Sequence, residues 1–305
     1  MTGGVRTFDV TDSVDGGGVE ELIEAKRGRT VSVCLPCRDE AATVGPLVSV
    51  IRQELMTRHD VVDELIVLDD RSTDDTARVA AHAGARVVSI EDVHATHGEG
   101  HGKGNALWAT LLASQGDVIV WCDGDVTSFE PEWVVKLVSP LLRDDSVALV
   151  KALYHRPTRY GGGGRTTELV ARPLMSRYFP GLTGLAQPLS GEYAGARSVL
   201  EQLSFVQGWG VEMAMLVDIA ELLGAEAIGQ VDLGHRLHRH RSLQSLSVQA
   251  AEVMATMLDR AGVPSATGEA EQMLRRADGS EVPLNLASRP SLVSLGLSRG
   301  GPDPS

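Results

Sequence analysis

The sequence predicts an α/β fold in which helices flank a mostly parallel central sheet and a smaller, mixed half follows. Two observations predict this fold. Short runs rich in Val, Ile and Leu alternate with longer amphipathic segments, which is the pattern of parallel strands covered by helices. Hydrophobic residues also make up 43% of the 305 residues, enough to bury the core of one large domain or two closely packed ones.

The first half alternates strands and helices in a regular order. The run 31–35 is β-branched and apolar, and 41–55 has apolar positions at helical spacing. Residues 72–75 (Ser-Thr-Asp-Asp) offer a helix cap with acids in the first turn, and Pro131 suits the first turn of another helix. Strands are expected at 31–35, 64–68, 86–90, 117–122 and 147–153, and helices at 41–55, 72–83, 103–114 and 131–142.

The second half is less regular. Helices are expected at 167–178, 211–223 and 243–260, and strands at 193–196 and 227–233. The two ends of the chain are rich in Gly with Asp and Glu, or in Gly with Ser, Pro and Ala, so we expect loosely ordered tails there. The predicted division is therefore a tail at 1–28, two halves at 29–150 and 151–262, and a second tail at 263–305.

Composition and charge exclude several classes of protein. A net charge of −13, from 28 Lys and Arg against 41 Asp and Glu, disfavours a nucleic-acid binder. Small anions are not excluded, because residues 151–200 hold seven basic and two acidic side chains, a local charge of +5. Because we find no signal peptide, no spanning run and only three cysteines, we expect a soluble, cytoplasmic protein with no membrane partner.

Polar segments follow three of the expected strands, at the edge where sheets of this kind bind ligands. They are 36–40 (Pro-Cys-Arg-Asp-Glu), 69–75 (Asp-Asp-Arg-Ser-Thr-Asp-Asp) and 123–125 (Asp-Gly-Asp). Asp123 and Asp125 can bind Mg²⁺ or Mn²⁺ and bridge it to a diphosphate. Alone, this pair more often indicates a turn built from Asp and Gly, but the other polar strand ends favour a metal site.

Three further groups suit anions or metals. The glycine-rich loop 98–102 leads to Lys103 at a helix start, where backbone N–H groups and the lysine can hold an anion, although a surface loop has a similar composition. Arg165 follows a glycine run and is a fork-shaped donor for a phosphate, or else a surface arginine. His238 and His240 can face one side of a strand end as metal ligands, or belong to a solvated basic turn.

Eight segments, taken in order, resemble one family. They are LPCRDE at 35–40, ELIVLDDRSTDDT at 64–76, GKGNALW at 102–108, DGD at 123–125, GGGRTTELVARPL at 162–174, QPLSGEY at 187–193, GWGVE at 208–212 and DLGHRLHRHR at 232–241. They resemble the GT-A glycosyltransferases, and among them the actinobacterial glucosyl-3-phosphoglycerate synthases, which share a family with the mannosyl-3-phosphoglycerate synthases. The resemblance implies a GT-A (Rossmann-like) fold over about residues 31 to 260.

The resemblance also implies roles for single residues. The donor-binding residues would be Pro36, Cys37, Arg38, Glu40, Asp70, Lys103 and Asp123. The acceptor-binding residues would be Gly164, Arg165, Thr167 and His240, the metal ligands Asp125 and His238, and the catalytic residues Asp125, Glu212 and Lys103. The half at 29–150 would then bind a nucleotide sugar and the half at 151–262 the acceptor. Arg38 stands where the family usually has an uncharged residue, and His240 where it usually has an amide.

An activity follows from the resemblance as well. A metal-dependent hexosyltransferase would move glucose from UDP-glucose to the 2-hydroxyl of 3-phosphoglycerate with retention of configuration, using Mg²⁺ or Mn²⁺, on the route to glucosylglycerate or methylglucose lipopolysaccharide. No residue is an evident covalent nucleophile, so we expect front-face attack. The alternatives are a mannosyl homologue that uses GDP-mannose and another GT-A glycosyltransferase. A non-catalytic nucleotide-sugar sensor is disfavoured by the presence of Asp123, Asp125 and His238. The family also suggests a homodimer.

Overall fold

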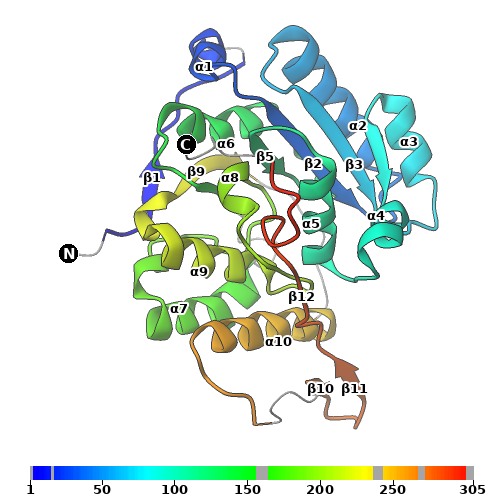
Figure 1. Cartoon of the computed structure of the whole chain (residues 1–305), viewed down its shortest axis with the longest axis vertical. Helices are drawn as coiled ribbons and strands as arrows, with labels where there is room; N and C mark the ends of the chain where they lie inside the picture. Colours follow the sequence, from blue (N-terminus) through cyan, green and yellow to red (C-terminus); the bar gives the residue numbers. More distant parts are fainter. Residues whose placement is uncertain (1–2, 15–16, 156–163, 236–242, 267–271, 300–305) are drawn as a thin grey trace.

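The computed structural model describes residues 3–14, 17–155, 164–235, 243–266 and 272–299. An eight-stranded sheet crosses the molecule with helices on both faces (Figure 1), and β7 alone runs antiparallel to its neighbours in it. This confirms the predicted α/β fold with a mostly parallel sheet. Across the sheet the strands are β1 (Arg6–Phe8), β9 (Ile228–His235), β6 (Leu149–His155), β7 (Tyr193–Ala196), β5 (Val118–Trp121), β2 (Val31–Cys37), β3 (Glu64–Asp69) and β4 (Arg86–Ser89).

The helices divide between the two faces of the sheet. One face packs on α1 (Val19–Ala25), α2 (Val44–Val50), the π-helix η1 (Ile51–Arg58), α3 (Thr76–Ala83) and α6 (Glu132–Arg143). The other packs on α4 (Ile90–His97), α5 (Lys103–Ala113), η3 (Thr167–Ala171), α7 (Arg172–Tyr178), η4 (Pro180–Leu182), α8 (Arg197–Leu200), α9 (Val211–Leu223), η5 (Ala225–Ala227) and α10 (Leu243–Arg260). No helix in the described ranges is both long and apolar enough to cross a membrane.

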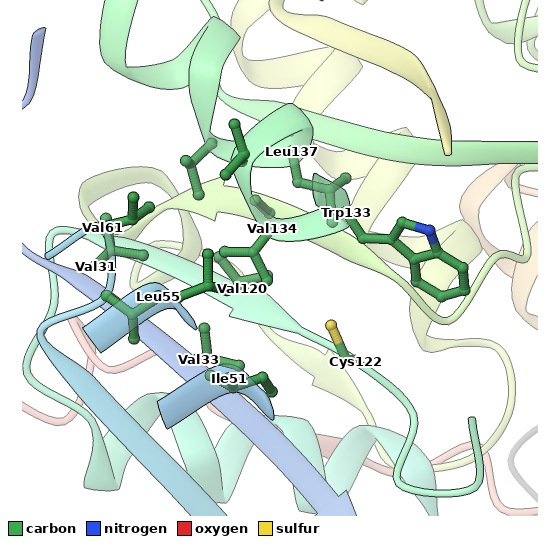
Figure 2. Close-up of a cluster of buried hydrophobic side chains, with 14 of the residues drawn as sticks. Val31, Val33, Ile51, Leu55, Val61, Val120, Cys122, Trp133, Val134 and Leu137 are labelled. Atoms are coloured by element: carbon green, nitrogen blue, oxygen red, sulfur yellow. The ribbon is translucent and has the colours of Figure 1, made fainter. Parts of the chain in front are cut away.

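The two faces are apolar because successive strand residues point to opposite sides. Along β2, Val31 and Val33 join the cluster on the α2 and α6 side, whereas Cys34 joins the cluster on the α5 side. Figure 2 shows the first cluster, where strand valines lie beside Leu55 of η1 and Val134 of α6. A strand buried on both faces has to read as a continuous apolar run, which is why these strands were predictable from the sequence.

The two ends of the chain differ from the loosely ordered tails that we expected. Near the amino terminus, β1 pairs in parallel with β9 and adds an edge strand to the sheet. Near the carboxyl terminus, β10 (Met273–Arg275) and β11 (Glu281–Pro283) form a hairpin, and β12 (Ser288–Arg289) pairs with β8 (Phe205–Val206). These strands have two or three residues each, too few to give a periodic signal in a sequence rich in Gly and Ser.

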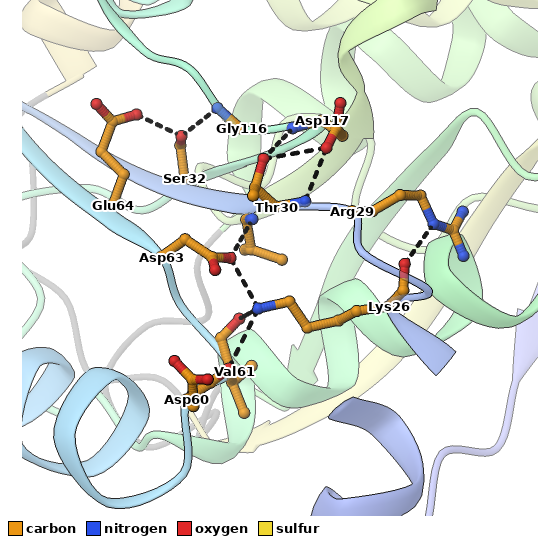
Figure 3. Close-up of polar contacts among 11 residues, drawn as sticks. Lys26, Arg29, Thr30, Ser32, Asp60, Val61, Asp63, Glu64, Gly116 and Asp117 are labelled. Carbon is orange, nitrogen blue, oxygen red and sulfur yellow. Dashed lines mark hydrogen bonds and ion pairs between the residues drawn. The ribbon is translucent and has the colours of Figure 1, made fainter. Parts of the chain in front are cut away.

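A network of polar contacts fixes the amino ends of the central strands (Figure 3). The ammonium of Lys26, after α1, donates to Asp63 Oδ2 at 2.7 Å, and the same oxygen accepts the backbone N–H of Val31 at 2.7 Å. Ser32 Oγ donates to Glu64 Oε2 at 2.6 Å and accepts the backbone N–H of Gly116 at 2.7 Å. The starts of β2, β3 and β5 are thereby held in register, so that their carboxyl ends also lie together.

Candidate active site

The polar segments after β2, β3 and β5 meet at one edge of the sheet, as predicted. The register pairs Cys37 of β2 with Asp69 of β3, and Cys34 with Trp121 of β5, so the three strands end within a few residues of one another. Beyond this edge the hydroxyl of Thr43 donates to the carbonyl oxygen of Gly124 at 2.7 Å. The Asp-Gly-Asp turn is therefore fastened to the segment that precedes α2.

Lys103, the first residue of α5, is the centre of the site. Its Nζ atom lies 3.3 Å from Asp123 Oδ1 and 2.7 Å from Glu212 Oε1, and Glu212 lies in the first turn of α9. Burial disfavours the charged form of Lys103, but Asp123 and Glu212 outweigh it and hold the pKa of Lys103 well above its usual range. The lysine is a fixed cation at the sheet edge, and the structure brings it together with two other residues predicted from the sequence, Asp123 and Glu212.

Lys151 and Tyr193 belong to the same buried region and were missed by the sequence analysis. Lys151 Nζ donates to the carbonyl oxygen of Ser190 at 2.7 Å and lies 3.9 Å from the centre of the Tyr193 ring. Burial lowers the pKa of Lys151 to about 7. The Tyr193 hydroxyl is buried and has no hydrogen-bond partner among the residues that the structure describes. A lone lysine inside the apolar run 149–153 was the signal that could have identified this group.

Close approach of a backbone turn fixes the place of Asp123. A Cβ atom at Gly191 would lie 2.0 Å from Asp123 Oδ2, so a larger residue at position 191 would displace the carboxylate. Gly191 is adjacent to Ser190, whose carbonyl oxygen accepts from Lys151. Lys151 therefore supports the turn that packs against Asp123.

The other predicted donor-site residues lie at the same edge with different exposure. Asp70 is buried, and Arg71 Nη2 donates to its Oδ1 at 2.8 Å. Pro36 and Cys37 are the last residues of β2, and burial raises the pKa of the Cys37 thiol. Arg38 is exposed and Glu40 is half-buried, with the backbone N–H of Glu40 donating to Thr76 Oγ1 at 2.8 Å.

The predicted metal and acceptor residues are only partly described. Asp125 is half-buried, two residues after Asp123. His238 and His240 lie outside the described residues, as does the start of the glycine run. Gly164 and Arg165 are half-buried and Thr167 is buried at the start of η3, which packs against α10 and α7. The roles assigned to these residues stay predictions.

The fold and this cluster define a class of protein. A mostly parallel sheet with paired carboxylates and a half-buried lysine beyond the carboxyl ends of its strands suits the binding of a nucleoside diphosphate with a divalent cation. A fixed positive charge at that point can stabilise a diphosphate as it departs. These are the features of a GT-A glycosyltransferase.

Comparisons with known proteins place the chain more narrowly. Residues 32–203 match the family described as Glycosyl transferase family 2. Glucosyl-3-phosphoglycerate synthase of Mycolicibacterium paratuberculosis is 44% identical over 297 residues, which cover 92% of this chain and 89% of that protein. The enzyme of the same name from Petrotoga mobilis is 43% identical over 250 residues, 79% of this chain and 77% of that protein.

A solved structure agrees with these sequence relatives. The crystal structure of glucosyl-3-phosphoglycerate synthase from Mycobacterium tuberculosis in complex with Mn²⁺, UDP-glucose and phosphoglyceric acid superimposes with a TM-score of 0.85 at 40% identity, covering 95% of this chain and 98% of that one. The chain therefore belongs to glycosyl transferase family 2 and, within it, to the glucosyl-3-phosphoglycerate synthases. This confirms the family that the sequence motifs resembled.

Proposed function

We propose that this enzyme transfers glucose from UDP-glucose to the 2-hydroxyl of 3-phosphoglycerate with retention of configuration. The observation that carries the proposal is Lys103 held between Asp123 and Glu212 at the edge of the sheet. The relatives support the same donor and acceptor, because the Mycobacterium tuberculosis enzyme has been solved with UDP-glucose and phosphoglyceric acid. Like that enzyme, which binds Mn²⁺ or Mg²⁺, this one is a metal-dependent glycosyltransferase.

The residues present fit a divalent cation. Asp123 and Asp125 provide the carboxylate oxygens that Mg²⁺ and Mn²⁺ prefer, and the absence of a side chain at Gly191 leaves room for the Asp123 carboxylate itself. Asp125 and His238 would hold the ion. Bound there, the ion would act as a Lewis acid that compensates the charge of the diphosphate.

The protein side chains divide the remaining work. Lys103 stays protonated and is placed to donate hydrogen bonds to the diphosphate as UDP leaves. Glu212 is paired with Lys103 at 2.7 Å, which makes it a poor nucleophile and leaves it to orient the sugar hydroxyls of the donor. Retention without a covalent intermediate then requires attack on the same face from which UDP departs.

Acceptor binding is assigned to the start of η3 and its neighbours. Arg165 would hold the phosphate of 3-phosphoglycerate through charge-assisted hydrogen bonds, with the hydroxyl of Thr167, Gly164 and His240 alongside. The local charge of +5 over residues 151–200 favours an acceptor that carries both a phosphate and a carboxylate. Holding the acceptor in line supplies much of the rate by orientation.

A matrix of donors and acceptors tests the assignment. UDP-glucose, GDP-glucose and GDP-mannose are each combined with 3-phosphoglycerate and with other phosphorylated acids, with and without Mn²⁺, and nucleotide release is measured. We expect UDP-glucose with 3-phosphoglycerate and Mn²⁺ to give the highest kcat/KM. A preference for GDP-mannose would identify a mannosyl homologue, and no turnover with any pair would support a non-catalytic nucleotide-sugar sensor.

The homodimer and the cytoplasmic location inferred from the sequence stay predictions. A groove of ≈ 380 Å³ between α10 and the β10–β11 hairpin is lined mostly by apolar residues, among them Met254, which is 45% exposed. We infer that the enzyme dimerises through this face, because exposed apolar side chains mark association surfaces. Light scattering of the full chain should then give twice the monomer mass, and Met254→Glu should lower it. A monomeric wild type would remove the inference.

A further inference from the structure

A buried arginine in the carboxyl-terminal segment contacts the loop that carries Lys103. Arg289, in β12, is 5% exposed and makes three hydrogen bonds. Its Nε donates to Asn105 Oδ1 at 2.7 Å, its Nη1 to the carbonyl oxygen of His97 at 2.9 Å, and its Nη2 to the carbonyl oxygen of Gly98 at 2.8 Å. A buried cation is tolerated only where such groups satisfy it, so the position of the guanidinium is closely defined.

Three contacts of Arg289 fall on one short stretch of chain. His97 ends α4, Gly98 follows it, and Asn105 lies in the first turn of α5, two residues after Lys103. The guanidinium also lies over the ring of Trp108 in α5, with 5.0 Å between Cζ and the ring centre. Arg289 therefore joins the end of α4 to the start of α5 across the glycine-rich loop.

Other residues of the same carboxyl-terminal segment also hold the glycine-rich loop and α5 in place. The side-chain amide of Asn285 donates to the carbonyl oxygen of His101 at 2.6 Å, and Trp108 Nε1 donates to the carbonyl oxygen of Pro290 at 2.8 Å. The segment is itself fixed by the pairing of β12 with β8. Figure 1 shows it lying beside α5.

One glycine of the loop, Gly100, is explained by this packing. A Cβ atom at Gly100 would lie 2.4 Å from Arg289 Nη2 and 2.1 Å from Asn105 Oδ1. The guanidinium therefore packs directly against the loop backbone, and a larger residue would separate the two.

We propose that Arg289 is a positioning residue for the donor site: by fixing the loop 97–105, it sets the place of Lys103 between Asp123 and Glu212. Arg289 is separated from this loop by more than 180 positions in the sequence. The carboxyl-terminal segment would therefore support the donor site indirectly, through the loop that carries Lys103. The inference rests on the proposed function, because it takes Lys103 as the lysine that meets the diphosphate of UDP.

Calorimetric binding of UDP in the presence of Mn²⁺ to the full chain tests the inference. Arg289→Met should weaken UDP binding roughly 10-fold, as is typical when a supporting shell is removed, and should raise KM for UDP-glucose more than KM for 3-phosphoglycerate. The matched control is Arg299→Met, an exposed arginine of the same segment, which should leave binding unchanged. Unchanged binding in Arg289→Met would overturn the inference.

A double-mutant cycle separates positioning from a general structural role. If Arg289 acts through Lys103, then Arg289→Met should have less than about a twofold effect on UDP binding in a Lys103→Met background. Equal effects in both backgrounds would overturn the inference. If Arg289→Met does not fold, Asn285→Ala, which removes only the contact with His101, replaces it in the same cycle. A wild-type enzyme that fails to bind UDP would instead refute the proposed function.

Discussion

Single residues set the electrostatics of the donor site. Lys103 is half-buried, and its charge is kept because two carboxylates face it at 3.3 Å and 2.7 Å. The same ion pair compensates the negative charge of Glu212, whose side chain is only 4% exposed. An ion pair of this kind is costly to break from one side, so both partners are expected to act as a unit in mutant kinetics.

Removing the charge of Asp125 tests the metal site. Asp125→Asn keeps the shape of the side chain but provides a weaker oxygen ligand, so we expect Mn²⁺-dependent transfer to fall at least about 100-fold. Initial rates across a Mn²⁺ titration measure the effect, and circular dichroism checks the fold. Asp145→Asn is the control, because Asp145 is 80% exposed and its carboxylate pairs with Arg29 at 3.1 Å. Near-normal turnover in Asp125→Asn would remove Asp125 from the metal site.

Removing Arg165 tests the acceptor site. Arg165→Ala should raise KM for 3-phosphoglycerate about 10- to 100-fold, the equivalent of one or two lost charge-assisted hydrogen bonds, with little change in KM for UDP-glucose. Steady-state kinetics with each substrate varied in turn distinguish the two. Arg177→Ala, an exposed arginine of α7, serves for comparison. A change confined to the donor kinetics would show that the acceptor site has been misplaced.

The residues that the sequence could identify are those whose neighbours in the chain already carry the signal. Asp123 and Asp125 follow an apolar strand directly, and Lys103 follows a glycine-rich loop at a helix start. Arg289 has no such local context, since the groups it binds lie at positions 97 to 105. Lys151 was visible only as an anomaly in an apolar strand. Contacts of high sequence separation are fixed by the fold and leave no pattern in one sequence.

Among the strands, those of four or more residues were predictable and those of two or three residues were not. Strands buried on both faces give continuous apolar runs, and the predicted positions of β2, β3 and β5 hold to within two residues. The strand expected at 86–90 instead ends at Ser89, because its hydroxyl accepts the backbone N–H of Glu91 at 3.2 Å and caps α4. That cap, followed by Glu91 and Asp92, was a readable signal for a helix that we did not expect.

The hydrogen bonds of Glu64, at the start of β3, lead to a prediction for the stability of the sheet at low pH. Its oxygens accept from Ser32 at 2.6 Å, from the backbone N–H of Gln115 at 2.7 Å and from Arg86 at 2.8 Å. Burial opposes ionisation, but these hydrogen bonds outweigh it and hold the pKa of Glu64 below its usual 4.5. Because the folded pKa is lowered, this stabilisation is present above pH 4.5 and is lost as the pH falls through the folded value.

Glu64→Gln should therefore lower the free energy of unfolding at pH 7 by about 1–2 kcal/mol, the contribution of hydrogen bonds to a charged group that is partly exposed. Urea unfolding at pH 7 and at decreasing pH measures it, and the difference from wild type should shrink below pH 4.5. Glu221→Gln, an exposed glutamate of α9, should leave the unfolding free energy unchanged. A difference that stays constant with pH would mean that the charge of Glu64 is not involved.

For the whole molecule, net charge is a poor guide to what the site binds. The chain carries −13, yet the donor site holds Lys103 as a fixed cation, and the segment 151–200 is locally basic. Charges buried at the edge of a sheet act at short range, whereas carboxylates on outer helices are screened by salt over roughly 10 Å. A protein can therefore be acidic overall and still take substrates that are both anions.

Lys151 links the stability of the whole fold to pH. Its pKa is lowered by burial from 10.5 in the unfolded chain to about 7 in the fold, so between these values the unfolded state binds more protons than the folded state. The free energy of unfolding should therefore rise with pH above about 7, by up to about 1.4 kcal/mol per pH unit from this one group. Lys151→Met lacks the titrating amine, so this contribution to the pH dependence should be absent from the variant.

Urea unfolding of both proteins at pH 7, 8 and 9 tests this link, because titrating groups that do not interact with Lys151 cancel in the difference between them. Wild type should gain stability relative to Lys151→Met as the pH rises. Loss of the hydrogen bond to Ser190, 2.7 Å long in wild type, adds a constant offset that does not change this slope. Lys151→Arg should destabilise at every pH, since a guanidinium does not lose its proton in this range. Parallel curves for wild type and Lys151→Met would mean that Lys151 stays charged in the fold.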